Sequence, residues 1–467
     1  MLHRTFYTAA GLLMLALLLP WLLARDIAAD GALFASMARN MAEGIGSFWK
    51  PLSAVGGEPF LEHPPLAFGL QALFFLVFGD QWFVERIYSL LAAMLTGWAL
   101  VELWKTLYTE RHHRRMQWLP LMMWITIPVV FWSYRNNMVD NTLAVFTTFA
   151  VVFMLRACVL QAGEFLVLGS LFTLAAFFTK GIAGAFPLLV PLLYGIYDHR
   201  HGVMKGSLQT LIVTAVTTAL VAGVAFVIPA AHQNITQYFN VQMWPQLAVA
   251  GNAVFTTQSS LPIELLKQLT PVLLCLVAVA IMRLRSRRTP SDIRRNAWFG
   301  TTLGLVASAP LVLLNETSPQ SLLIALPFFA MSFATMLVPM IHESMEMRSV
   351  SWRNAGFGFN VVAVLVLVML CTVFFNRPTR YAALLTDADN ISSGVANCKI
   401  VSCDWTTAED RQLSAYLQRM HRIQLVGGTE YEYLLMKKSD KLNPPRGYDV
   451  QLVPLHGYVL YKKASMN

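Results

Sequence analysis

The sequence predicts a mainly α-helical, polytopic membrane protein that has about 11 membrane-spanning helices and ends in a small α/β domain. Hydrophobic side chains make up 56% of the 467 residues, whereas charged side chains make up only 13%. The mean hydropathy is +0.52. Soluble domains carry about a quarter of their residues as charged side chains, so this composition excludes an ordinary soluble globule.

Twelve apolar segments follow one another along the chain, most of them near the ~20 residues that are needed to cross a bilayer. The first segment, 6–23, resembles a signal peptide, but its run of about 18 apolar residues exceeds the usual h-region and predicts an uncleaved span. The segments lie at residues 6–23, 64–79, 87–104, 116–133, 139–160, 164–179, 183–197, 206–229, 263–282, 297–315, 320–340 and 356–375.

The loops between these segments predict the orientation in the membrane. Lys and Arg concentrate in residues 105–115, 200–205, 283–295 and 348–353, and six arginines fall in the third of these loops. Residues 229–262 and 315–320 contain no Lys or Arg. The positive-inside bias therefore places the four basic loops and the N-terminus in the cytoplasm. These loops also account for the net charge of +9 without a nucleic-acid partner.

This charge pattern holds only if one early segment does not cross the membrane. Segment 64–79 opens with Pro64 and Pro65 and has only about 16 residues, so we expect it to lie at the outer interface. Residues 30–43 show a helical apolar period and predict a second interfacial helix, with Asp30 as its cap and Gly44 as its stop. Eleven spans remain, which places the C-terminus outside.

The composition changes after Phe375 to a mixed-charge stretch, which predicts a membrane domain at 1–376 and a periplasmic α/β domain at 377–467. Residues 404–420 are typical of an amphipathic helix, and 422–426 and 450–461 are typical of strands. Cys398 and Cys403 could pair in an oxidising compartment, although a loop with four intervening residues is tight, and both states stay open. Cys158, Cys275 and Cys371 lie in apolar runs and are expected to be inert.

Polar side chains from several separate segments are expected at one depth, at the outer surface of the membrane. Carboxylates there could act as bases, and cations could hold a phosphate. Each residue also has a structural interpretation, as a helix cap, a snorkelling lysine or a stabilising ion pair. The joint placement favours an enzyme acting on a lipid headgroup. These residues are Asp26, Asp30, Glu58, Glu62, His63, Glu85, Arg86, Arg135, Asp140 and Lys180.

Five motifs in order resemble those of the GT-C glycosyltransferases, in particular the protein O-mannosyltransferases and the lipid A aminoarabinose transferases. The resemblance covers roughly residues 1–200, weakens through 230–340 and is not evident in the last 90 residues. The motifs are Asp30-Gly31-Ala32-Leu33-Phe34 with Ala38-Arg39-Asn40-Met41, Glu62-His63-Pro64-Pro65-Leu66, Glu85-Arg86, Val139-Asp140-Asn141 and Thr179-Lys180-Gly181-Ile182.

The resemblance implies an inverting transfer of a sugar from a polyprenyl (undecaprenyl) phosphate to an acceptor at the periplasmic face of the bacterial inner membrane. Asp30 matches the proposed base, and Asp140 matches a second acid that orients the sugar or the acceptor. Phosphate-neutralising cations would be His63, Arg86 and Lys180, and arginine suits a phosphate because it can bind it in a bidentate manner. No cofactor is required, and a divalent metal is not indicated. Further candidates for the substrate cavity are Glu62, Tyr134, Arg135 and Gln242.

Three departures from the family pattern concern the same site. Gly31 stands where many relatives carry a second acid, so catalysis would depend on Asp30 there. His63 replaces the lysine of the aminoarabinose enzymes, which would make phosphate affinity sensitive to pH. Residues 317–321 stand where relatives often carry Lys and Tyr before a late span.

Other function classes remain open. A transporter or flippase of a lipid-linked sugar would show paired broken helices at mid-membrane and related halves, and neither is visible in the sequence. A catalytically inactive scaffold is favoured by Gly31 but disfavoured by the retained Asp30, Asp140 and Lys180. An oligosaccharyltransferase shares the broad fold, but its Trp-Trp-Asp sequence is absent. The expected partners are a lipid-linked sugar donor, a lipid, glycan or protein acceptor, and membrane lipids.

Overall fold

A computed structural model describes residues 2–464 except 55–56, 58, 254–261, 271–272, 275–289, 314–317, 348, 379, 396–397 and 441–446. The chain divides into two compact units, each described by itself. Unit 1 comprises residues 1–20, 61–67 and 89–372, and unit 2 comprises residues 21–60, 68–88 and 373–467. The expected domain boundary at 376/377 stays a prediction. Unit 2 contains the C-terminal segment together with two early segments of the chain.

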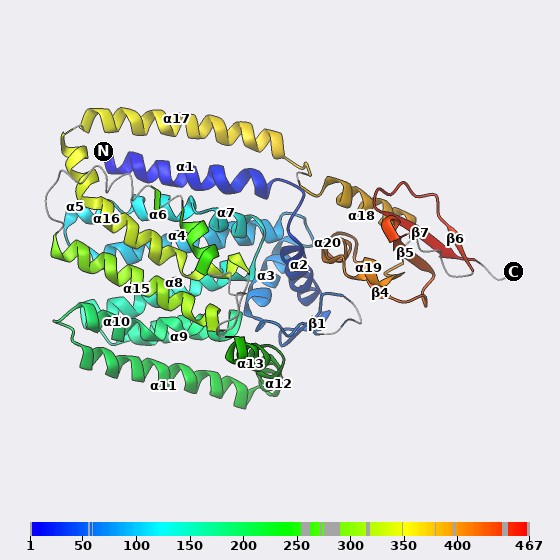
Figure 1. The fold of residues 1–467 in the computed structure, drawn as a ribbon, viewed down its shortest axis with the longest axis horizontal. Helices are drawn as coiled ribbons and strands as arrows, with labels where there is room; N and C mark the ends of the chain where they lie inside the picture. Colours follow the sequence, from blue (N-terminus) through cyan, green and yellow to red (C-terminus); the bar gives the residue numbers. More distant parts are fainter. Residues whose placement is uncertain are drawn as a thin grey trace. The chain divides into compact units, whose positions relative to one another are not determined.

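Long helices that lie side by side dominate the membrane part of the chain (Figure 1). Within the described residues, seven helical stretches are long and apolar enough to span a bilayer, or eight if a bent pair is counted as one span. The bent pair is α6 (Trp118–Ile125) with α7 (Pro128–Arg135), which meet at 75°. The seven are α1 (Leu2–Leu22), α4 (Val84–Leu107), α8 (Val139–Leu160), the stretch Glu164–Tyr197, α11 (Val203–Val227), α16 (Leu326–Met347) and α17 (Ser349–Phe374).

The stretch Glu164–Tyr197 reverses direction at Gly181. It consists of α9 (Glu164–Lys180), the 3₁₀ segment η1 (Gly181–Leu189) and α10 (Val190–Tyr197). Gly181 has φ +63°, a conformation that ends α9 and suits glycine. Gln161 before α9 and His201 after α10 bring their side chains to 3.4 Å, so both ends of the stretch lie together. Two antiparallel segments therefore occupy the places expected for separate spans at 164–179 and 183–197.

The expected total of about 11 spans stays a prediction, because half of segment 263–282 lies outside the described residues. The helix α15 (Ser291–Leu313) contains residues 297–313 of the expected span at 297–315, and residues 314–315 lie outside the described residues. The remaining short elements of this part of the chain are α5 (Arg111–Arg114), α12 (Pro229–Gln237), η2 (Tyr238–Met243), α13 (Trp244–Ala253) and η3 (Pro319–Ile324).

Burial separates the central helices of unit 1 from its outer helices. In the most apolar stretch of 18 residues in α8, 72% of the residues are buried. The same fraction is 11% in α11 and 6% in α17. Both outer helices expose large aliphatic side chains, such as Leu211 and Leu365. Exposed apolar faces of this kind suit contact with lipid tails, and the protein is a multi-pass membrane protein.

Two short helices in unit 2 correspond to the expected interfacial helices. The helix α3 (Leu66–Phe78) has 13 residues, and at 1.5 Å per residue it is about 20 Å long, too short to cross a ~30 Å hydrocarbon core. The helix α2 (Ala29–Ala42) begins one residue before Asp30 and has Ala28 as its N-cap, so the prediction that Asp30 caps it is wrong. Gly44, at φ +77°, follows the end of α2 as expected.

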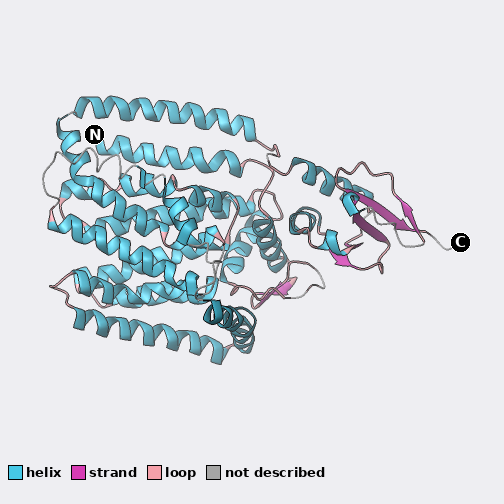
Figure 2. Cartoon of the chain, in the orientation of Figure 1, coloured by secondary structure: helices cyan, strands magenta, loops and turns pink. Residues whose placement is uncertain are grey.

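The C-terminal segment forms a small α/β fold with one five-stranded sheet (Figure 2). The other strands of the described residues, β1 (Gly46–Ser47) and β2 (Lys50–Pro51), form a hairpin. The strand order is β4-β3-β5-β7-β6. Strand β3 pairs in parallel with β4 and β5, whereas β7 is antiparallel to β5 and β6. The elements are α18 (Ala382–Gly394), β3 (Ile400–Cys403), α19 (Trp405–Ala408), α20 (Arg411–Tyr416), η4 (Leu417–His421), β4 (Gln424–Gly427), β5 (Tyr433–Lys437), η5 (Lys438–Asp440), β6 (Tyr448–Val450) and β7 (Tyr458–Lys463).

This segment confirms the expected α/β character and corrects two of its elements. The helix expected at 404–420 is broken, because Asp410 interrupts it and caps α20 by accepting a hydrogen bond from the Leu413 amide. The strand expected at 450–461 is two strands, β6 and β7. Cys398 and Cys403 are both free, and burial raises the pKa of the Cys403 thiol to about 11.

Candidate functional site

Three polar side chains meet inside unit 1. The Lys180 ammonium donates to Asp140 Oδ1 at 2.8 Å and to Ser321 Oγ at 2.8 Å. Asp140 lies in the first turn of α8, and Lys180 is the last residue of α9. A helix N-terminus favours an anion and a C-terminus favours a cation, so the backbone of each helix stabilises the charge that it carries.

This cluster is almost completely removed from solvent. Asp140 is 4% exposed, Lys180 is 8% exposed and Ser321 is fully buried. Because burying charged groups is costly, an ion pair at this depth holds only if both groups are paired and hydrogen-bonded. The pair joins two of the residues that the sequence predicts for the site.

Tyr238 of the loop segment η2 covers the residue that follows Lys180. A Cβ atom added at Gly181 would overlap the hydroxyl group of Tyr238. Tyr238 itself is 5% exposed. The absence of a side chain at Gly181 therefore lets η2 pack directly against the end of α9.

A buried hydrogen-bond network fixes the start of α8 beside Asp140. Asn141 donates to Ser89 Oγ at 3.0 Å and accepts from Ser133 Oγ at 2.7 Å. The Tyr134 hydroxyl donates to Thr96 Oγ1 at 2.9 Å, and its ring is fully buried. Tyr134, a residue of α7, thus packs against α4.

The other candidates of unit 1 lie on three separate segments. Glu62 is exposed and His63 is half-buried, directly before α3. Arg135 ends α7, and its guanidinium lies 5.7 Å from the centre of the Phe131 ring. Gln242 is a half-buried residue of η2.

Unit 2 contains Asp30 and Arg86. Asp30 is half-buried in the first turn of α2. Arg86 is 4% exposed, and it donates from Nε to the Trp82 carbonyl at 3.1 Å and from Nη2 to the Arg25 carbonyl at 3.0 Å. Its buried Nη1 has no hydrogen-bond partner among the described residues. A buried guanidinium with a spare donor group is suited to an anionic oxygen.

Glu85, the neighbour of Arg86 in the same sequence motif, has a different role. Its carboxylate accepts from Arg419 at 2.9 Å, and Arg419 also donates to Asp80 at 2.7 Å. Burial alone lowers the pKa of Arg419, but Glu85 and Asp80 outweigh it and raise the pKa. In this motif Glu85 therefore anchors the C-terminal segment, whereas Arg86 keeps one N–H group without a hydrogen-bond partner among the described residues.

Arg39 and Asn40 of α2 are likewise used for structure. Arg39 donates to the carbonyl oxygens of Gln418 and Arg419, and burial lowers its pKa to about 10. Asn40 donates to the carbonyl oxygens of Leu52 and Ser53. These contacts hold η4 and the β1–β2 hairpin segment on α2.

The structure thus brings Asp140 and Lys180 together in one unit, and it places Asp30 and Arg86 in the other. Sequence reasoning missed Ser321 and Arg419 as partners. Ser321 falls within 317–321, where the family pattern is interrupted, and that departure was the one available signal. Residues 314–317 and Glu58 lie outside the described residues.

Comparison with known proteins relates part of the chain to a known family and the structure to a known fold. Residues 62–228, which carry His63, Arg86, Asp140 and Lys180, match the model of the dolichyl-phosphate-mannose-protein mannosyltransferase family. The structure is similar to that of ArnT from Cupriavidus metallidurans bound to undecaprenyl phosphate, at a TM-score of 0.61 and 13% identity over 98% of each chain. The chain has the GT-C fold.

The GT-C fold also relates the chain to larger proteins. It is similar to the Archaeoglobus fulgidus oligosaccharyltransferase in complex with Zn and sulfate, at a TM-score of 0.52 and 10% identity over 91% of this chain and 68% of that chain. The chain is also similar to AglB from the same organism, in complex with an inhibitory peptide and a dolichol-phosphate. The TM-score is 0.50 and the identity is 11% over 93% of this chain and 69% of that chain. No curated protein sequence matches the chain. The family matched by residues 62–228 is one of glycosyltransferases, which confirms the expected enzyme class.

Proposed function

We propose that this GT-C protein transfers a sugar from a polyprenyl phosphate, such as undecaprenyl phosphate, to an acceptor hydroxyl or phosphate at the periplasmic face of the bacterial inner membrane. The observation that carries the proposal is the spare Nη1 group of buried Arg86, which could donate to the phosphate of the donor lipid. Support comes from the ArnT structure, which was determined with undecaprenyl phosphate bound.

In the proposed reaction, Asp30 takes the proton of the acceptor hydroxyl while the acceptor oxygen attacks the anomeric carbon. The bond from that carbon to the phosphate oxygen breaks, and the configuration inverts. The lipid phosphate leaves with an additional negative charge, which Arg86 stabilises. His63 is a further candidate for the phosphate. Asp140 orients the sugar or the acceptor. Lys180 pairs with Asp140 and is a further candidate for the phosphate. No cofactor is required for this chemistry.

The orientation is part of the proposal. Gln161 and His201 meet near the basic loop 200–205, whereas Asp140, Lys180 and Ser321 meet at the opposite ends of α8 and α9. The positive-inside bias makes the basic end cytoplasmic, so the cluster around Asp140 would face the periplasm. A reporter fused after Asn376 should then be active only on the periplasmic side, and a cytoplasmic signal would overturn the orientation.

Transfer itself is the direct test. Purified protein in lipid is incubated with membrane extract and labelled undecaprenyl-phosphate sugars, and wild type is compared with Asp30→Asn and Arg86→Gln. Asp449→Asn, which changes an exposed acid of β6, is the matched control. We expect transfer by wild type and the control, and loss of turnover in the folded Asp30→Asn protein. Equal transfer by wild type and Asp30→Asn would refute the role of Asp30. Binding of several donors without transfer would favour a transporter or an inactive scaffold.

A further inference from the structure

Four of the ten histidines gather in unit 1, and the proposed function uses none of them. His112 and His113 belong to α5, His342 belongs to α16, and His3 belongs to α1. The rings of His112 and His342 stack at 4.6 Å, and His3 is close enough to His342 to interact with it electrostatically. The segments therefore meet through side chains that can bind metals.

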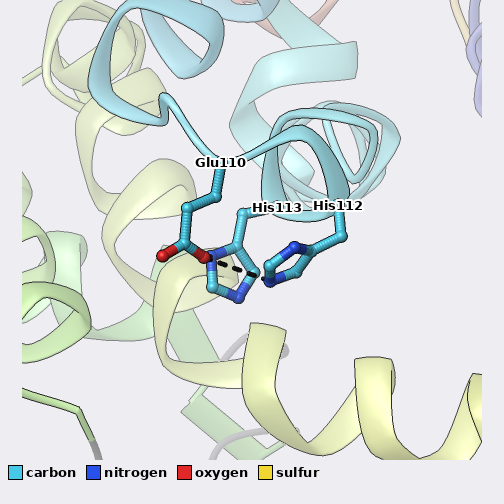
Figure 3. A group of neighbouring side chains, drawn as sticks. All are labelled: Glu110, His112 and His113. Carbon is cyan, nitrogen blue, oxygen red and sulfur yellow. Dashed lines mark ion pairs between the residues drawn. The ribbon is translucent and has the colours of Figure 1, made fainter.

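Glu110, His112 and His113 point toward one another (Figure 3). One carboxylate oxygen, Glu110 Oε2, lies 3.1 Å from His112 Nε2 and 3.1 Å from His113 Nδ1. The three ligand atoms all lie within 4.8 Å of one another. Zinc bonds of about 2.0–2.2 Å in a tetrahedral site separate neighbouring ligand atoms by roughly 3.3–3.5 Å. A small rotation of these side chains would therefore place all three around one ion.

We infer that Glu110, His112 and His113 form a binding site for Zn²⁺. Two imidazole nitrogens with one carboxylate oxygen are a ligand set that zinc uses, whereas Mg²⁺ and Ca²⁺ require mostly oxygen ligands. Both imidazoles coordinate in their neutral form, so the metal replaces the protons that would otherwise link them to Glu110. Water takes the fourth position.

The residues around the site favour Zn²⁺ over Mg²⁺ and Ca²⁺. Arg111, Arg114 and Arg115 surround the ligands in sequence and repel cations that bind through charge alone. Zn²⁺ gains much of its affinity from nitrogen ligands instead. Access is open, since the side chain of His112 is 45% exposed and that of Glu110 is 58% exposed.

A bound ion would order a segment that contacts two further helices of unit 1. His113 is held at its carbonyl oxygen by Trp104 Nε1 of α4 at 3.0 Å, and His112 stacks on His342 of α16. His342 in turn contacts Glu346 at 3.5 Å. Ordering His112 and His113 around Zn²⁺ therefore also orders the stacked ring on α16, and the site links the loop after α4 to that helix.

The simplest competing explanation is a pair of ordinary hydrogen bonds. Two neutral histidines can each donate one proton to Glu110 at the observed 3.1 Å, without any metal. This arrangement would show no preference for Zn²⁺ over Mg²⁺, so metal binding separates the two explanations.

The test uses full-length protein in lipid or detergent, with an affinity tag that contains no histidine. After treatment with EDTA, the protein is dialysed against Zn²⁺, and bound metal is measured by mass spectrometry. We expect one Zn²⁺ per chain for wild type, and affinity weakened by at least about tenfold in His112→Ala and His113→Ala. His199→Ala, which changes an exposed histidine of the loop between α10 and α11, should bind as wild type does.

Thermal unfolding provides a second readout that does not depend on activity. Zn²⁺ should raise the unfolding midpoint of wild type and His199→Ala but not that of Glu110→Gln, which preserves the size of the side chain and both imidazoles. Mg²⁺ should have no such effect. Equal zinc binding by wild type and the His112→Ala/His113→Ala double variant would overturn the inference, and so would equal shifts with Mg²⁺ and Zn²⁺.

Discussion

The buried pair of Lys180 and Asp140 permits a quantitative prediction. Lys180→Met removes the ammonium group and leaves the Asp140 carboxylate, whose side chain is 6% exposed, without its counter-ion. Removing one partner of a buried pair costs about 3–5 kcal/mol. We therefore expect the unfolding free energy to fall by about that amount, since Met fills the volume of the lysine chain but supplies no charge.

The double variant distinguishes a lost charge from lost packing. In Lys180→Met/Asp140→Asn no buried charge remains unpaired, so its cost should be less than the sum of the two single costs by at least about 1.5 kcal/mol. Equilibrium unfolding in mixed micelles, followed by tryptophan fluorescence, measures all three variants.

An exposed ion pair serves as the matched control. Lys267 pairs with Glu264 at 3.6 Å, and its side chain is 68% exposed, so Lys267→Met should cost less than about 1 kcal/mol. The reasoning would be refuted if Lys180→Met cost no more than Lys267→Met, or if the costs of Lys180→Met and Asp140→Asn simply added in the double variant.

Other predictions follow from the surroundings of both units. Gly181→Ala should cost at least about 1–3 kcal/mol in thermal unfolding, because φ of +63° strains alanine and the new methyl group displaces Tyr238; an unchanged midpoint would contradict the described packing. Tyr134→Phe should lower stability by about 1 kcal/mol and leave any transfer activity in place. Burial raises the pKa of Asp80, but Arg419 outweighs it and lowers the pKa, so the stabilisation by Asp80 is present above about pH 4 and lost as the pH falls. Unfolding midpoints between pH 3 and 6 should show this loss in wild type and a smaller loss in Asp80→Asn.

The meeting of Asp140 and Lys180 could be predicted from local information. The helices α8 and α9 are separated by only three residues, 161–163, so they must run antiparallel. The first turn of α8 and the last residue of α9 then lie at the same end. Hydropathy and loop charges likewise sufficed for the membrane fold and the two short helices, because both signals are local.

Partners that are distant in the sequence could not be predicted. Ser321 follows Lys180 by 141 residues, and Arg419 follows Glu85 by 334 residues. No periodicity links such positions, so Glu85 and Arg39 were indistinguishable from site residues of the same motifs. The broken helix at 404–420 has a different cause, because Asp410 forms a cap within an otherwise continuous amphipathic pattern.

The pairing of Glu85 with Arg419 also has a consequence for how the protein is made. The ribosome adds about 5–20 residues per second, so the 334 residues between the two take roughly 20–70 s to synthesise. During that interval Asp80 and Glu85 exist without the arginine that neutralises them. The nascent chain therefore has to keep a carboxylate hydrated, or shielded by the insertion machinery, until Arg419 has been translated. Truncation before Arg419 would leave that state permanent, which makes the α/β segment that carries Arg419 a checkpoint for assembly of the protein.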